Sequence, residues 1–109
     1  MAADVVFTAE SPWYTNSHTW KRITEYAASR PGGPLQEDYH SHLDALGVDF
    51  TFLPDSTAAE VAGWLSVVIE GMLAEGEMGR SEADREHAHE LIRKLHSEVE
   101  ARDHRGEPR

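Results

Sequence analysis

Seven histidines in a chain of 109 residues are the side chains best suited to chemistry, because imidazole can bind metals and exchange protons near neutral pH. Two His-x-His patterns occur, His40-Ser41-His42 and His87-Ala88-His89. Both lie in sequence that is predicted to be helical, where residues i and i+2 point about 200° apart. Neither pair can therefore hold one ion between its two rings.

Glu37, His40 and Asp44 form a better-spaced group, at positions i, i+3 and i+7 of a predicted helix. Two carboxylates with one imidazole suit a hard or borderline divalent ion. However, the three side chains span two turns of a face that is predicted to be exposed. The favoured interpretation is therefore that they are polar surface residues that bind no metal. No metal and no cofactor is predicted. His42 falls on the apolar face of the same helix and is predicted to be a buried or half-buried neutral histidine, with a catalytic or pH-sensing role as the alternative.

Motifs that would identify an enzyme are missing. The chain has no nucleophile elbow, no phosphate-binding glycine loop, no dinucleotide fingerprint, no H-E-x-x-H and no EF-hand loop. It has no cysteine, which excludes disulfides, Cys-ligated zinc and thiol catalysis. A small metal-dependent or acid–base enzyme that uses His40, His42 or His89 stays open as an alternative, since catalytic groups need only meet in space.

The charge is strongly one-sided, with 20 acidic and 10 basic residues and a formal net charge of −10. This balance disfavours direct binding to nucleic acid or to an anionic membrane. The span from Pro31 to Gly79 contains no lysine or arginine. Its acids are Glu37, Asp38, Asp44, Asp49, Asp55, Glu60, Glu70, Glu75 and Glu77. They indicate either an ordinary solvated surface or an acidic face that meets a basic partner, with Glu37, Asp38 and Asp44 as candidate contacts.

Large aromatic residues supply candidate anchors for such a partner. Trp13 and Tyr14 follow Pro12 in a predicted loop, and these two residue types are common at binding hot spots. Trp64 and Val67 lie on a second apolar edge of a predicted helix, near Gly71. Each group has a second interpretation: Trp13 and Tyr14 could cover the core, and the helix could be packed on both sides within its own domain.

The elements that position these residues are short strands and amphipathic helices. Asp4 to Thr8 and Val48 to Leu53 are predicted strands that pair with each other, the second with Val48, Phe50 and Phe52 inward. Helices are predicted from Asn16 or Ser17 to the Arg30–Pro34 turn, over Leu35–Leu46, over Thr57–Ala74 with a Thr57–Glu60 capping box, and from Ser81 to about Ala101.

The buried faces follow from the apolar spacing. Trp20, Ile23 and Ala27 form one stripe, and the broad stripe that begins at Ala58 marks Thr57–Ala74 as the centre of the core. The outer side of the last helix carries the pairs Glu90–Lys94 and Glu98–Arg102 at i,i+4 spacing, which predicts a solvated face. Residues 102–109 are predicted to be a frayed polar tail after a single domain of residues 1–101.

These observations predict an α+β domain, mostly helical, with about four helices and a small two-stranded sheet. The predicted function is a cytoplasmic protein-binding module of the inhibitor, immunity or anti-defence type, which acts on a basic, nucleic-acid-handling protein. The alternatives are the small enzyme and a homo-oligomeric structural subunit built through Trp64, Val67 and Gly71. No basic leader is present and the apolar stretch Trp64–Ile69 is short, so no membrane association is predicted.

Overall fold

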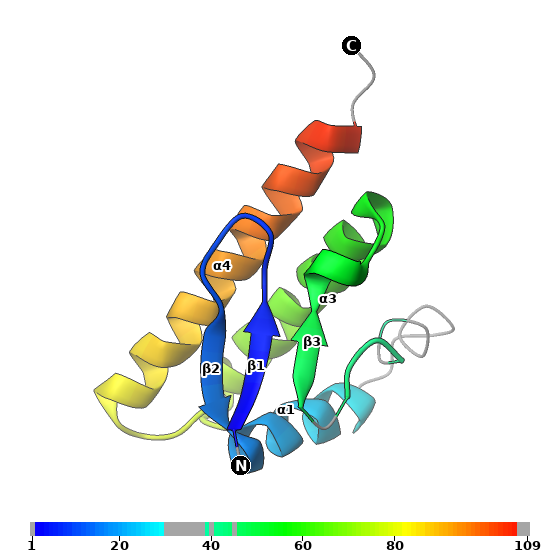
Figure 1. The fold of residues 1–109 in the computed structure, drawn as a ribbon. Helices are drawn as coiled ribbons and strands as arrows, with labels where there is room; N and C mark the ends of the chain where they lie inside the picture. The colour runs from blue at the N-terminus through cyan, green and yellow to red at the C-terminus, as the bar shows by residue number, and fades with distance from the viewer. Residues whose placement is uncertain (1, 30–38, 40, 45, 107–109) are drawn as a thin grey trace.

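The computed structural model describes residues 2–29, 39, 41–44 and 46–106 of the chain (Figure 1). Its elements are the strands β1 (Ala2–Val6), β2 (Trp13–Asn16) and β3 (Gly47–Asp49), the 3-10 helix η1 (Phe50–Phe52), and the helices α1 (Ser17–Ser29), α3 (Asp55–Ala74) and α4 (Glu82–Gly106). The predicted α+β, mostly helical class is confirmed. Within the described residues there are three long helices and three strands, where four and two were predicted.

The sheet has the strand order β2-β1-β3. β1 runs parallel to β3, with Val5 opposite Val48, so the predicted pairing of the two strands is confirmed. β1 also pairs antiparallel with β2, where Val5 lies opposite Trp13. The prediction of a loop at β2 was wrong, because a strand of four residues is too short to show the alternation that identifies strands in sequence.

The second predicted strand ends early. The Asp49 side chain accepts a hydrogen bond of 2.9 Å from the Thr51 backbone N–H, and the chain turns into η1 directly after β3. Phe50 is buried, whereas Phe52, which was predicted to point inward, is 84% exposed. The local cap thus overrides the apolar alternation of the segment.

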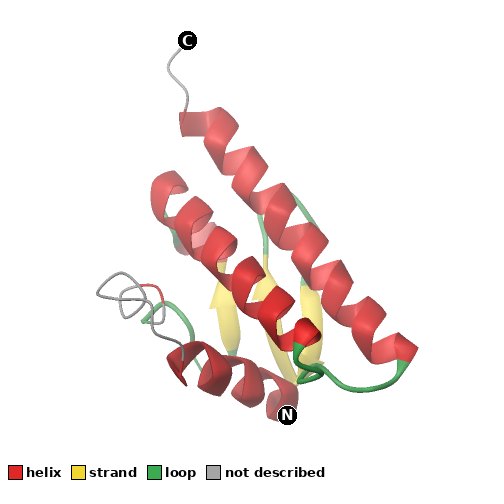
Figure 2. Cartoon of the chain, turned by 180° about the vertical axis from the view of Figure 1, so that it is seen from behind, coloured by secondary structure: helices red, strands yellow, loops and turns green. Residues whose placement is uncertain are grey.

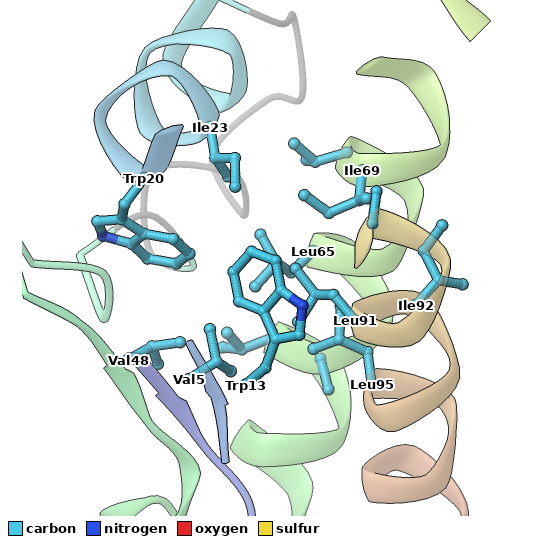
Figure 3. Packing of buried hydrophobic residues seen from close by; sticks show 14 of the residues in the cluster. Val5, Trp13, Trp20, Ile23, Val48, Leu65, Ile69, Leu91, Ile92 and Leu95 are labelled. Atoms are coloured by element: carbon cyan, nitrogen blue, oxygen red, sulfur yellow. The ribbon is translucent and has the colours of Figure 1, made fainter. Parts of the chain in front are cut away.

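One face of the sheet is covered by α3 and α4, which pack side by side, and α1 crosses near the base of the sheet (Figures 1 and 2). Trp13, Trp20, Leu65 and Leu91 meet in the core between these layers (Figure 3). The predicted stripes of α1 and α3 are confirmed by the buried residues Trp20, Ile23, Ala27, Ala58, Val61, Ala62, Leu65, Val68, Ile69 and Met72.

The predicted helix Leu35–Leu46 lies largely outside the described residues. Near its end, Asp44 forms an isolated antiparallel bridge with Gly47 and Leu46 is 56% exposed, so the predicted helix end at Leu46 is wrong. His42 is exposed in a turn rather than placed on an apolar face. Tyr39 packs against the core as expected.

The helix ends follow local signals in two of three cases. The Asn16 side chain accepts a hydrogen bond of 2.7 Å from the Thr19 N–H at the start of α1. The Ser81 hydroxyl accepts one of 3.0 Å from the Asp84 N–H at the start of α4. The capping box predicted at Thr57 is wrong, because α3 already begins at Asp55 with no side-chain cap.

Helix α3 is long and apolar enough, by length and composition, to cross a membrane, and it is the one such helix in the described ranges. The sequence prediction understated its apolar length. In the structure α3 carries eight buried residues at the centre of the core, which is how the core helix of a soluble protein looks. A single helix of this kind is weak evidence for a membrane span.

Candidate protein-binding face

The sheet has one face that no described helix or strand covers. Side chains alternate between the two faces of a strand, and Ala3, Val5, Trp13 and Val48 are buried against the helices. The residues between them therefore point to the opposite side, from which Figure 1 is viewed. We call this surface the open face; it consists of Ala2, Asp4, Val6, Tyr14, Asn16 and Asp49.

The open face is acidic and carries one large aromatic ring. Tyr14 is 59% exposed and lies directly opposite Asp4 in the β1–β2 register. The Asp4 carboxylate, which is half-buried, makes no hydrogen bond or ion pair with any described residue. Asp49 lies opposite Val6 on the other side of β1. Because the three strands contain no lysine, arginine or histidine, no cation on the sheet itself neutralises these carboxylates.

Both edges of the sheet are partly capped. The Tyr14 carbonyl oxygen accepts a hydrogen bond of 2.7 Å from Nε2 of His87, which must therefore carry a proton. At the other edge, the backbone N–H and C=O of Gly47 both bond with Asp44. Occupied edge groups oppose the addition of a strand from another chain. The open face, rather than an edge, is thus the more accessible part of the sheet.

Two exposed apolar side chains lie next to β3 in the sequence. Leu46 precedes the strand and is 56% exposed, and Phe52 follows it in η1 and is 84% exposed. Apolar side chains that are exposed next to one another mark contact sites, whereas single ones are ordinary on a protein surface. Asp44, a predicted contact, is also exposed in the segment before β3.

Only some of the predicted anchors are accessible. Trp13 is 1% exposed, stacks on His87 with ring centroids 4.5 Å apart, and belongs to the core. Trp64 is half-buried with its ring centroid 5.8 Å from that of Tyr39, whereas Val67 is 66% exposed on α3. The predicted contacts Glu37 and Asp38, with the metal candidate His40, lie outside the described residues.

The acids of the base-free span do not all stay unpaired. Glu77 lies 3.3 Å from Arg22, and Asp55 lies 2.7 Å from Arg102. Residues from outside the span therefore offset part of its charge. Of the candidate acidic contacts in the described residues, Asp44 and the open-face residues Asp4 and Asp49 lack such ion pairs.

The histidines that the structure describes do not form a metal-binding cluster. Within the described ranges, no group of three or more His, Asp or Glu side chains could hold a metal ion. His42 and His89 are exposed, and His96 faces Glu70 on the surface. A groove of about 640 Å³ beside α1 combines His18, Lys21 and Asp44 with four other residues, Ser17, Trp20, Thr24 and Leu43. Of the histidines that the enzyme alternative uses, His42 and His89 do not line this groove, and His40 lies outside the described residues.

Of the two charged pairs predicted on the solvated side of α4, Glu98 and Arg102 are both buried, and in the other pair Lys94 is buried while Glu90 is exposed. This is the largest error of the sequence prediction. Glu98 is fully buried and Arg102 is 5% exposed. The Glu98 carboxylate accepts hydrogen bonds from the Thr8 N–H at 2.8 Å, the Thr8 hydroxyl at 2.6 Å and Arg102 Nε at 2.8 Å. A signal was present, since Leu91, Leu95, Glu98 and Arg102 stand at positions i, i+4, i+7 and i+11, which is one row along the core side of the helix.

Arg102 joins three parts of the chain. Its Nη1 donates to the Leu53 carbonyl at 3.1 Å and to Asp55 at 2.7 Å, and its Nη2 donates to the Phe50 carbonyl at 2.6 Å. Among the described residues no buried side-chain polar atom lacks a partner. α4 also continues to Gly106, so the predicted frayed tail from residue 102 is wrong at its start. A satisfied, closed network of this kind holds the fold and offers no free group for chemistry.

Two opposed effects act on the pKa of Glu98. Burial raises it, and the hydrogen bonds from Thr8 and Arg102 lower it by more, so the pKa lies below its ordinary value of 4.5. Burial likewise lowers the pKa of Arg102, and its bonds to Glu98 and Asp55 raise it by more. The Glu98 carboxylate therefore stabilises the fold fully above pH 4.5, and this contribution is lost as the pH falls through the lowered pKa.

We accordingly expect the stability difference between the native chain and the variant Glu98→Gln to depend on pH. It should stay constant from about pH 7 to about pH 5 and shrink toward about pH 3, because only the native chain loses a carboxylate there. Urea unfolding of both proteins at each pH measures this difference, and subtraction removes the titration of the other acids. A difference that stays constant down to the acid limit would contradict the lowered pKa.

Comparison with known proteins adds no relative. No protein-family model, no curated protein and no solved structure matches this chain. The functional argument therefore depends on what the open face and the charge distribution can do physically.

Proposed function

We propose that this chain is a small acidic protein-binding module that inhibits a basic, nucleic-acid-handling protein, and that the open face is its contact surface. The observation that carries the proposal is an uncovered sheet face with an exposed tyrosine, carboxylates and no cation. Such a face suits a partner surface that is positively charged and carries donors for the carboxylates.

The net charge of −10 supports the same kind of partner. The association rate constant of an acidic protein with a basic one is higher than that of two neutral proteins, because their opposite charges steer the diffusional encounter. A protein that handles nucleic acid carries a positive patch for phosphates, and carboxylates placed over that patch compete with the nucleic acid. Inhibition by occlusion needs no catalytic group.

The size of the surface is consistent with binding if the flanks take part. A standard interface buries about 800 Å² on each partner, which is more than three short strands can supply alone. Leu46, Phe52 and Tyr14 together provide exposed apolar area around the acidic residues. An apolar patch with charged neighbours is the usual anatomy of a specific interface.

The test begins with capture of the partner from a lysate of the source cells at low and moderate salt, followed by binding kinetics with the purified partner. We expect the association rate constant to fall about tenfold or more as salt rises, since screening weakens the steering. Association that is insensitive to salt would contradict an electrostatically guided contact.

A matched pair of variants separates the open face from the net charge. Asp4→Asn and Glu60→Gln each remove one negative charge. The first lies on the open face, and the second lies at an exposed position of α3. We expect Asp4→Asn to weaken binding several-fold and Glu60→Gln to have a smaller effect. Equal effects of the two changes would mean that the open face is not the contact.

A homo-oligomeric subunit is the second candidate, because Val67 is 66% exposed on α3. Trp64, its proposed neighbour in the interface, already packs on Tyr39, and two copies of an acidic chain repel each other. Light scattering of the purified chain decides between them: a dimer mass that Val67→Ser converts to a monomer supports the oligomer.

A further inference from the structure

We infer that the open face recognises an arginine side chain of the partner, with the guanidinium stacked on the Tyr14 ring and hydrogen-bonded to the Asp4 carboxylate. This inference rests on the proposed function and adds the chemical identity of the group that the face selects. It is carried by the placement of an exposed ring beside a carboxylate that has no partner in the described chain.

The backbone brings these two side chains close together. The backbone N–H of Asp4 donates to the Leu46 carbonyl at 2.9 Å. The backbone N–H and C=O of Asp4 therefore point toward β3 and away from β2. The Tyr14 carbonyl likewise points outward, to His87. Asp4 and Tyr14 thus form a non-hydrogen-bonded antiparallel pair, in which opposite Cα atoms are only about 4.5 Å apart and the side chains lie side by side.

Contacts with α4 fix the strand that carries the Tyr14 ring in the unbound chain. Trp13, the residue before Tyr14, is buried and donates its indole N–H to the His87 carbonyl at 2.9 Å. The Tyr14 carbonyl is hydrogen-bonded to the His87 ring. Residues 13 and 14 of β2 are therefore both hydrogen-bonded to His87 of α4. Binding on a preorganised strand loses less conformational entropy than binding on a mobile loop.

An arginine uses both groups at once, whereas a lysine does not. The planar guanidinium stacks on an aromatic face and still directs its N–H groups along its edge to a carboxylate. The lysine ammonium is a compact, strongly hydrated charge with no plane to stack. Val6 and Asp49 continue the surface on the next row of the sheet, with apolar area for the arginine stem and a second negative charge.

The chain's own cations are placed elsewhere. Among the described residues, Arg93 and Lys94 bind Glu10, Arg22 pairs with Glu77, and Arg102 is buried. None of them has an ion pair with Asp4 or Asp49. The described residues thus supply no complementary charge to the open face, and a basic segment of a partner protein can supply it.

Two peptides of equal length and charge test the inference, one with arginines and one with lysines at the same positions. Each is titrated into the isotope-labelled full chain while amide chemical shifts are followed. We expect the arginine peptide to shift Asp4, Val6 and Tyr14 and to bind about 3–10-fold more tightly than the lysine peptide.

Variants assign the preference to the ring. Tyr14→Leu should remove the preference for arginine, and Tyr14→Phe should keep it because the aromatic face remains. Phe52→Ser removes an exposed ring that is not part of the Asp4–Tyr14 pair, so it should leave the ratio of the two affinities unchanged even if both peptides bind more weakly. Both positions are exposed, and the spectrum of each of the three free variants checks that the fold is retained.

The outcomes separate this inference from the proposed function. Equal affinity for the two peptides, with shifts that still map to the open face, would overturn arginine recognition and leave a charge-guided contact intact. Absence of shifts on the open face at millimolar concentrations of both peptides would overturn the inference and the proposed contact surface together.

Discussion

Replacement of Glu98 by glutamine is expected to lower the free energy of unfolding by about 3 kcal/mol, because it removes one of the two carboxylates that pair with the buried Arg102 and leaves Asp55 as the other. Glu98 is fully buried and its two oxygens accept bonds from Thr8, Ala9 and Arg102. The amide of glutamine presents N–H donors to groups that are themselves donors. A domain of this kind is stable by only about 5–15 kcal/mol, so the loss is a large part of the total.

Urea unfolding followed by circular dichroism measures the change, with Glu86→Gln as the control. Glu86 lies on the same helix and is exposed, so its replacement is expected to change stability by less than about 0.5 kcal/mol. If Glu98→Gln does not fold, Thr8→Val removes only the 2.6 Å hydroxyl bond and is expected to cost about 1.5–3 kcal/mol. A loss below about 1 kcal/mol in both variants would show that the network contributes little.

Replacement of Gly47 by alanine is the second large effect, with an expected loss of about 3 kcal/mol or more. The backbone φ of Gly47 is +125°, a value that residues with a side chain rarely adopt. A Cβ at this position would lie 1.7 Å from the Asp4 carbonyl oxygen. β3 would have to move away from β1, and the open face would lose one of its three strands. Hydrogen exchange at the Asp4 amide, which bonds to Leu46, should then become faster.

Gly76→Ala is the matched control for Gly47→Ala. Gly76 also has a positive φ, of +74°, but a Cβ at this position meets nothing within 4 Å. The left-handed backbone alone is expected to cost about 1–2 kcal/mol. Equal destabilisation by the two substitutions would mean that contact with Asp4 does not matter.

The long helices could be predicted because their apolar spacing is a local property of the chain. Trp20, Ile23 and Ala27 recur at helical intervals and are buried whatever they pack against. The caps at Asn16 and Ser81 are local as well, since each side chain bonds to an N–H three residues later. Pairing of the two predicted strands followed from the need of a lone strand for a partner.

The candidate site could be predicted only in part. The pair Trp13-Tyr14 was identified from residue type, and its strand conformation then sends one ring into the core and the other to the surface. That outcome depends on β1, which is distant in space until the chain folds. Asp4, the carboxylate beside Tyr14, was missed because its neighbourhood exists only through the β1–β2 register.

By itself, the sequence determined a mostly helical α+β chain with a large negative charge, no cysteine chemistry and three amphipathic faces, since these depend on composition and short-range periodicity. The tertiary structure alone decided that Glu98 and Arg102 are buried, because their partners Thr8, Phe50 and Leu53 come from distant segments. It also decided which carboxylates stay unpaired on the open face. Both outcomes are set by contacts between residues far apart in sequence, and such contacts form only when the layers pack.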